Sequence, residues 1–322
     1  MPPRAWLRVA QVAAMALACD RRPPAPEATP APEATPTPQS PPAVAAPTPA
    51  APEQPAATPQ PPAPRVRPGM RPSPGCTAPP RGGHETLALR VGAHDRSAEI
   101  DAPIAADGRT PLPLVIAFHG LGGSGALARR MFGLDVALGE QAVIAYPDGR
   151  ARRGRASNWE LAAAGEDFAL FDALVQQLGE RYCIDTARVF AVGHSYGATM
   201  ASALGCQRAA ALRGIAAVEG TPVLPRCDDE RVAALFVHGR DDHIVSVRLG
   251  EAARDAMLRR NDCDERGATR NDGDATCTRY DRCAPTEPVM WCEHRGAGLR
   301  GHMWPPHAAA TIAAFFDSLR PR

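Results

Sequence analysis

The last 240 or so residues of the 322-residue chain alternate short apolar runs with longer amphipathic stretches. The apolar runs predict strands at 86–91, 114–118, 142–146, 189–192, 214–218, 233–237 and 289–293. The longer stretches predict helices at 126–138, 167–181, 196–204, 247–260 and 307–319. Alternation of this kind is typical of an α/β fold with a mostly parallel sheet that helices cover on both faces.

Residues 20–75 follow a different pattern. Within 21–75 lie 20 of the 35 prolines and no aromatic residue, and the heptapeptide Pro-Ala-Pro-Glu-Ala-Thr-Pro occurs twice. Such a segment buries too little apolar surface to offset the entropy cost of ordering it. We therefore expect a disordered, extended Pro/Ala-rich linker at 20–75, followed by one folded domain at 76–322.

The first 19 residues have the features of an export signal. Arg4 and Arg8 precede an apolar run at 9–18 that is too short to span a bilayer. The run ends in Leu17-Ala18-Cys19, which resembles a bacterial lipobox, although the leucine stands one position later than usual. We predict lipidation of Cys19 and a secreted, periplasmic or cell-surface location. An ordinary signal peptide and a cytosolic start are the alternatives.

The cysteines indicate an oxidising compartment. There are nine, and no two have the C-x-x-C spacing of a metal site. If Cys19 carries a lipid, eight remain, which allows four disulfides. We expect the late loop to close on itself through pairs 263–277 and 283–292. The net charge of +1 gives no reason to expect a nucleic-acid partner, and a lipid anchor is the only membrane contact that we predict.

The segment Gly193-His194-Ser195-Tyr196-Gly197 lies between a predicted buried strand and a predicted helix of small residues. This is the G-x-S-x-G nucleophile elbow in the strand–turn–helix context that it requires. The glycines leave room for a strained turn that presents the serine hydroxyl. We predict that Ser195 is a nucleophile; the alternative is a Gly-Ser turn without a chemical role.

A serine nucleophile needs a base and an acid that orients the base. In proteins with this elbow the acid follows the serine along the chain, and the histidine base follows the acid. Two carboxylates, Asp241 and Asp242, follow the strand at 233–237. We predict that Asp242 is the acid and that Asp241 is a solvated residue paired with Arg240. His302, in the loop before the last helix, is the predicted general base. We expect structural rather than catalytic roles for the other nearby histidines, which are His194, His243, His294 and His307.

The glycine-rich run at 119–125 follows an early strand and predicts an oxyanion hole. We expect the backbone amides of Leu121 and Tyr196 to donate to the oxyanion, with Gly122 as the alternative to Leu121. A phosphate-binding turn is disfavoured because G-x-G-x-x-G is not matched and the chain has no lysine. The predicted chemistry needs no cofactor and no metal.

In combination these segments resemble the secreted esterases that include feruloyl esterases, acetylxylan esterases and poly(3-hydroxybutyrate) depolymerases. The likeness covers 118–125, 146–149, 167–185, the elbow, 238–242 and 301–305, and the cysteine-bearing stretches 277–283 and 289–292 resemble the feruloyl esterase branch. It implies an α/β-hydrolase fold and ester hydrolysis through an acyl-enzyme. The chain departs from the family pattern at His194, at Tyr196 and at Leu299-Arg300, which affects substrate choice more than reaction type.

We therefore expect a secreted, monomeric serine esterase that hydrolyses feruloyl or acetyl esters of xylan-type cell-wall polysaccharide. Trp304 and Trp159 are predicted to border the substrate cleft, although packing roles are the alternative for both. A polyhydroxybutyrate depolymerase-like or general short-chain carboxylesterase is the second hypothesis. A peptidase on the same fold and a non-catalytic surface lipoprotein are the hypotheses from other classes.

Overall fold

The computed structural model describes residues 68–151, 157–222, 227–264, 266–283 and 287–319. The predicted signal segment with Cys19, and the predicted linker up to residue 67, lie outside the described residues. The predicted domain boundary at Cys76 is too late. Ser73 donates its amide to the Ile184 carbonyl at 2.8 Å, and Pro72 forms a β-bridge with Asp185, so pairing with the folded domain already begins before Cys76.

The described residues form one ten-stranded sheet with the order β1-β2-β4-β3-β5-β6-β7-β10-β9-β8. The six central strands, in the order β4-β3-β5-β6-β7-β10, are parallel to one another, and antiparallel pairs extend the sheet at both edges. The strands are β1 (Gly83–Val91), β2 (His94–Ala102), β3 (Leu112–Phe118), β4 (Val143–Pro147), β5 (Ile184–His194), β6 (Gly214–Val218), β7 (Ala233–Gly239), β8 (Ala268–Asp272), β9 (Ala275–Tyr280) and β10 (Val289–His294).

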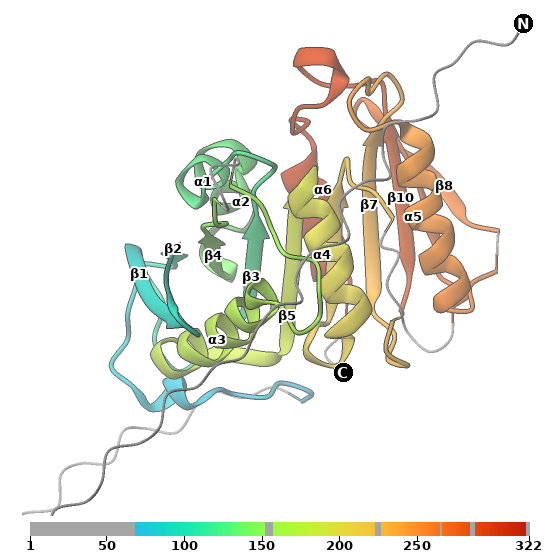
Figure 1. Ribbon diagram of the computed structural model, residues 1–322. Coiled ribbons are helices and arrows are strands. Elements are labelled where there is room, and N and C mark those ends of the chain that lie inside the picture. The colour runs from blue at the N-terminus through green and yellow to red at the C-terminus, as the bar shows by residue number, and fades with distance from the viewer. Residues whose placement is uncertain (1–67, 152–156, 223–226, 265, 284–286, 320–322) are drawn as a thin grey trace, which may run out of the picture. The chain divides into compact units, whose positions relative to one another are not determined.

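Helices cover both faces of the sheet (Figure 1). One face packs against α3 (Glu166–Arg181), α4 (Tyr196–Gln207) and α5 (Val247–Arg260), and the other against α1 (Gly125–Phe132), α2 (Leu134–Leu138) and α6 (Ala308–Asp317). Successive side chains of β3 alternate between these two cores, as strand geometry requires. The predicted α/β architecture is confirmed. Among the described residues, no helix has both the length and the apolar character that crossing a bilayer demands.

The helix predicted at 126–138 is wrong in one respect, because it is two helices. Gly133 has φ 61° and ψ 23°, a left-handed conformation that ends α1, and α2 begins at the next residue. Glycine adopts this conformation without the steric cost that a side chain would add. The part of the chain that the structure describes also has four short 3-10 segments, at Pro74–Thr77, Gly139–Gln141, Ala209–Ala211 and Leu299–Gly301.

Four disulfides join all eight described cysteines: Cys76–Cys183, Cys206–Cys227, Cys263–Cys283 and Cys277–Cys292. The predicted late pairs, 263–277 and 283–292, are wrong. Cys277 and Cys292 stand opposite each other on the antiparallel strands β9 and β10. This register joins them and leaves Cys263, after α5, to pair with Cys283. Four disulfides fit a protein of an oxidising compartment.

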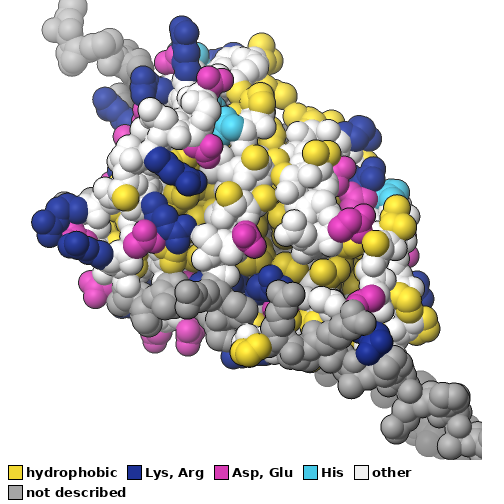
Figure 2. Space-filling model, turned by 180° about the vertical axis from the view of Figure 1, so that it is seen from behind, with side chains coloured by type: hydrophobic (Ala, Val, Ile, Leu, Met, Phe, Trp, Pro, Cys, Tyr) yellow, Lys and Arg dark blue, Asp and Glu magenta, His cyan; other side chains and the backbone are white. Residues whose placement is uncertain are grey.

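Charges of both signs are interspersed on the face shown in Figure 2, with hydrophobic side chains between them. A mixed surface of this kind agrees with the net charge of +1 over the whole chain.

Candidate active site

The nucleophile elbow joins the carboxyl end of β5 to the start of α4. Ser195 has φ 55° and ψ −119°, a strained conformation for a residue with a side chain. A Cβ atom at Gly193 would lie 2.0 Å from the Gly197 carbonyl oxygen, and one at Gly197 would lie 2.1 Å from the Phe118 carbonyl oxygen. Both positions therefore require glycine, which is the physical reason for the G-x-S-x-G spacing around a half-exposed Ser195.

The structure brings the three residues predicted for catalysis into one hydrogen-bonded chain. The Ser195 hydroxyl lies 2.9 Å from His302 Nε2, and His302 Nδ1 lies 2.6 Å from Asp242 Oδ2. The other carboxylate oxygen of Asp242 accepts hydrogen bonds from the amides of Ile244 and Val245, at 2.8 and 2.9 Å. Since His302 and Asp242 are both buried, the pair is held with little competition from water.

Asp241 has a different environment, as expected. It is exposed, and it pairs with Arg295 at 3.5 Å. The expected partner was Arg240, but that side chain pairs with Glu293 on β10. Backbone hydrogen bonds explain the change, because Arg240 and Asp241 donate to the carbonyls of His294 and Arg295. The loop that carries Asp242 is thereby tied to the segment that leads to His302.

The predicted oxyanion loop packs against Ser195. A Cβ atom at Gly120 would lie 3.4 Å from the Ser195 Cβ. The Gly120 carbonyl accepts from the Gly123 amide at 3.0 Å, and the Gly122 amide donates to the Ser157 carbonyl at 2.7 Å. The Gly122 amide is therefore engaged. Leu121 stays the predicted donor of this loop. In the planar, trans Gly120–Leu121 peptide, the Leu121 N–H points away from the Gly120 carbonyl, which accepts the Gly123 amide.

Tyr196 is the first residue of α4 and has no acceptor one turn earlier within the helix. Its amide lies at the positive end of the helix dipole, next to the Ser195 hydroxyl, where negative charge would develop. The two predicted oxyanion donors thus come from loops that contact the same serine. That they bind an oxyanion stays a prediction.

His119 is a residue whose importance we did not predict. Its ring is buried; Nδ1 lies 2.7 Å from the Gly120 carbonyl, and Nε2 accepts the Gly149 amide at 2.9 Å. These partners assign the neutral tautomer with the proton on Nδ1. Burial lowers the pKa of His119, which favours the same neutral form. The side chain therefore fixes the Gly120–Leu121 peptide that carries the predicted oxyanion donor.

Both tryptophans predicted to border the cleft are buried. Trp159 is 2% exposed, and its Nε1 donates to the His119 carbonyl at 2.8 Å. Trp304 is 9% exposed and stacks on Phe132 with ring centroids 4.0 Å apart. This burial favours the packing alternative for both side chains: Trp159 supports the predicted oxyanion loop, and Trp304 supports the loop of His302.

A second buried carboxylate lies beneath His302, and the sequence analysis did not identify it. Glu219 directly follows β6, is 0% exposed and has φ 55°. Its Oε2 lies 3.1 Å from His194 Nε2 and 3.4 Å from His302 Nδ1. These three side chains place donor atoms within 4.8 Å of one another. Because the two histidine nitrogens already face carboxylates at hydrogen-bond distance, we assign the group to hydrogen bonding rather than to a metal ion.

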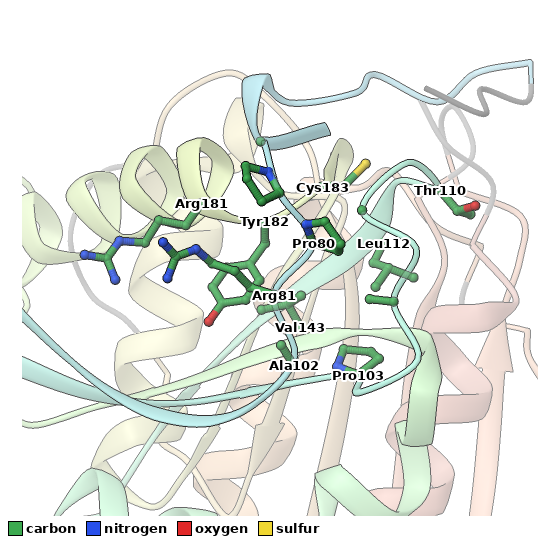
Figure 3. A pocket seen from close by; sticks show the side chains of 14 residues that line it. Pro80, Arg81, Ala102, Pro103, Thr110, Leu112, Val143, Arg181, Tyr182 and Cys183 are labelled. Carbon is green, nitrogen blue, oxygen red and sulfur yellow. The ribbon is translucent and has the colours of Figure 1, made fainter. Parts of the chain in front are cut away.

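The pocket in Figure 3 is unrelated to this site. Its wall includes Leu112, Val143 and Cys183, which lie at the amino ends of central strands, whereas Ser195 follows the carboxyl end of β5. Its volume of about 10 Å³ corresponds to about one water molecule. It is therefore a packing gap beside the Cys76–Cys183 disulfide, too small for an acyl group.

Comparison with known proteins supports the resemblance stated above. The phospholipase/carboxylesterase family model matches residues 162–279, which include the elbow and Asp242. Feruloyl esterase D of Neurospora crassa is 28% identical over 231 residues, covering 66% of this chain and 77% of that protein. A probable feruloyl esterase C of Aspergillus terreus is 29% identical over 225 residues, covering 67% of this chain and 81% of that protein.

The structure is similar to that of an acetyl xylan esterase from Aspergillus awamori, with a TM-score of 0.60. The match covers 72% of this chain and 99% of that one at 13% identity, and so it bears on the fold alone. The predicted resemblance is confirmed: the chain has the α/β-hydrolase fold and is similar in sequence to feruloyl esterases, and these findings support a carboxylic ester hydrolase.

Proposed function

We propose that the protein is a secreted serine esterase that hydrolyses feruloyl or acetyl esters of plant cell-wall polysaccharide. The hydrogen-bonded chain Ser195–His302–Asp242 carries the proposal. Ser195 attacks the ester carbonyl while His302 Nε2 takes the hydroxyl proton, and Asp242 stabilises the imidazolium that forms. His302 then protonates the leaving alcohol, and a water activated by the same imidazole releases the acid.

The rim of the site supports an aromatic acyl group. Four apolar side chains are exposed on the loops that carry the proposed site residues: Leu121, Ile244, Leu299 and Met303. Leu121 belongs to the proposed oxyanion loop, Ile244 follows Asp242, and Met303 follows His302. Exposed apolar side chains on the loops that carry a polar centre are typical of a ligand-binding surface, and a feruloyl ring offers the apolar area to cover them.

Hydrolysis of methyl ferulate, p-nitrophenyl butyrate and a peptide anilide tests this function, with wild type and Ser195→Ala side by side. We expect Ser195→Ala to lose both ester activities and wild type to prefer the ferulate. Loss of both activities without a ferulate preference would move a short-chain carboxylesterase or polyhydroxybutyrate depolymerase-like enzyme ahead. Activity on the anilide alone would indicate a peptidase, and full activity of Ser195→Ala would refute the proposed nucleophile.

Asp241 and Asp242 provide a matched pair for the proposed acid. Asp242→Asn removes the carboxylate that contacts His302, whereas Asp241→Asn removes one exposed charge from the adjacent position. We expect the first variant to lose most activity and the second to stay within about twofold of wild type. Equal losses in the two variants would contradict the assignment.

The proposed location rests on the four disulfides, which fit an oxidising compartment. Lipid anchoring at Cys19 is a separate proposal that rests on the sequence of the N-terminal segment alone. Radiolabelled fatty acid should enter the wild-type chain and not Cys19→Ala. Labelling that survives this substitution would refute the anchor site.

A further inference from the structure

The environment of Glu219 is unusual for a buried carboxylate. Its two oxygens are 3.1 to 3.6 Å from ring nitrogens of three histidines: His194, His294 and His302. Among the described residues no arginine pairs with it, and its Oε1 lacks a hydrogen-bond partner. A buried carboxylate is costly unless a positive charge or several donors offset its desolvation.

The proposed reaction supplies such a positive charge on His302, which takes up a proton when it acts as the general base. In the ground state the neutral His302 ring offers one N–H on Nδ1, and this nitrogen lies 2.6 Å from Asp242 and 3.4 Å from Glu219. When Nε2 takes the proton of Ser195, the ring becomes an imidazolium that faces two carboxylates. Interactions that strengthen only as the transition state forms accelerate the chemical step.

We infer that Glu219 is a second carboxylate of the site, a positioning residue that acts through His302 by stabilising its protonated form together with Asp242. The inference rests on the proposed function, because it needs His302 to act as the general base. The backbone supports the placement. The Glu219 amide donates to the Val237 carbonyl at 2.8 Å, and the positive φ turns the residue from the end of β6 toward the site.

Other titratable groups surround this pair, and each comes from a different packed element. They are His194 of β5, His238 of β7 at 3.5 Å from Asp242, Asp242 itself, His294 of β10, and His307 at the start of α6 beside His294. Of these, only Asp242 is a carboxylate, and the other four are imidazoles. Glu219 is therefore the second carboxylate within 4 Å of His302 Nδ1, at 3.4 Å beside Asp242 at 2.6 Å.

The test compares the pH dependence of kcat/KM for p-nitrophenyl butyrate in wild type, Glu219→Gln and Glu219→Asp. Glutamine keeps the shape and an acceptor oxygen but removes the charge, so the neutral form of His302 is favoured. We expect the acidic limb of the profile to move about one unit toward lower pH, and kcat/KM on the plateau to fall about tenfold. Glu219→Asp retains the charge and should hold the limb near its wild-type position.

Asp241→Asn is the matched control, since it removes a charge from the adjacent surface without touching His302. Its limb should coincide with that of wild type. A limb in Glu219→Gln that also coincides with wild type would overturn the inference, because a purely structural role would lower activity or stability without moving the limb.

A second measurement decides the question if Glu219→Gln does not fold. With Glu219 beside Nδ1, Asp242→Asn should keep about one hundredth of wild-type kcat, rather than the roughly ten-thousandth typical of a triad with a single carboxylate. A residual near one ten-thousandth would overturn the role of Glu219. The Ser195→Ala variant separates the proposed esterase function from the inference about Glu219. If Ser195→Ala loses activity while the Glu219 variants behave as wild type, the esterase function stands and only the role of Glu219 is refuted.

Discussion

Replacing His119 tests whether its imidazole fixes the predicted oxyanion donor. The Gly120 carbonyl is held by two donors, His119 Nδ1 at 2.7 Å and the Gly123 amide at 3.0 Å. The same planar peptide carries the Leu121 N–H, so holding the carbonyl also aims that donor. His119→Gln places an amide near the Nε2 position, where it can still accept from Gly149, but it removes the Nδ1 donor. His119→Asn does the reverse.

The expected magnitude follows from these contacts. Loss of a complete oxyanion donor costs about 10²–10³ in kcat. In His119→Gln the Gly123 amide still holds the Gly120 carbonyl, so the peptide is loosened rather than released, and we expect kcat to fall about tenfold with KM little changed. His119→Asn should keep kcat within about threefold. It leaves the Gly149 N–H without its acceptor, which should lower the free energy of unfolding by about 1–3 kcal/mol.

Two assays separate these effects. Steady-state hydrolysis of p-nitrophenyl butyrate gives kcat and KM, and urea unfolding of the same samples gives stability. We expect His119→Gln to have the larger loss of kcat. His119→Asn should lose stability in urea while its kcat changes little. Wild-type kcat in His119→Gln, or equal kcat losses in the two variants, would refute the claim that the Nδ1 contact aims the Leu121 amide.

Two further predictions concern stability. The Cys76–Cys183 disulfide closes a loop of 107 residues and the Cys206–Cys227 disulfide one of 21. Loop entropy gives a stabilisation of about 4.8 kcal/mol for the first and about 3.3 kcal/mol for the second. The double alanine variant of the first pair should therefore unfold at a lower urea concentration than that of the second, and the opposite order would contradict the entropic account. Burial lowers the pKa of His119 and of His238, so the unfolded chain binds protons at a higher pH than the folded chain. The stabilisation is present above about pH 6.5 and is lost as pH falls through the lower folded values. Tm should therefore drop between about pH 7 and about pH 5, and by less in His119→Asn; a Tm that is constant over this range would exclude the effect.

The sequence predicted the central strands because each is an apolar run buried on both faces. β6 and β7 are buried at every position, and the predicted ranges 214–218 and 233–237 match them closely. β2 was not predicted, because its buried positions include Arg96 and two alanines, and Ile100 is its only large apolar residue. β8 was missed for a stronger reason, since four of its five residues are exposed at the edge of the sheet. A strand is predicted from runs of large apolar side chains, and neither of these two strands has such a run.

The candidate site was predictable where one local pattern carries the chemistry. The elbow is such a pattern, because the glycines are required by contacts within a few residues of Ser195 and with the adjacent strand β3. His119 and Glu219 have no comparable local pattern. The partners of Glu219, His194 and His302, are 25 and 83 positions away along the chain. His119 contacts the adjacent Gly120 carbonyl, but its other partner is the Gly149 amide, and the burial of both side chains arises only in the assembled sheet. The disulfide pairs depended in the same way on a strand register that could not be derived from the cysteine spacing.

The sheet itself explains why three chemical groups meet at this edge. β5, β6 and β7 are parallel and in register, so that His194 pairs with Val218 and Val218 with Val237. The Ser195 amide donates to the Val218 carbonyl at 2.9 Å, and the Glu219 amide donates to the Val237 carbonyl at 2.8 Å. The carboxyl ends of β5, β6 and β7 therefore lie side by side. Ser195, which follows β5, and Glu219, which follows β6, each bond to the last part of the adjacent strand. The argument that selected a carboxylate after β7 applies equally to the residue after β6. A sequence search for the acid of such a site should accordingly examine the ends of both strands, and here it would have found Glu219 as well as Asp242.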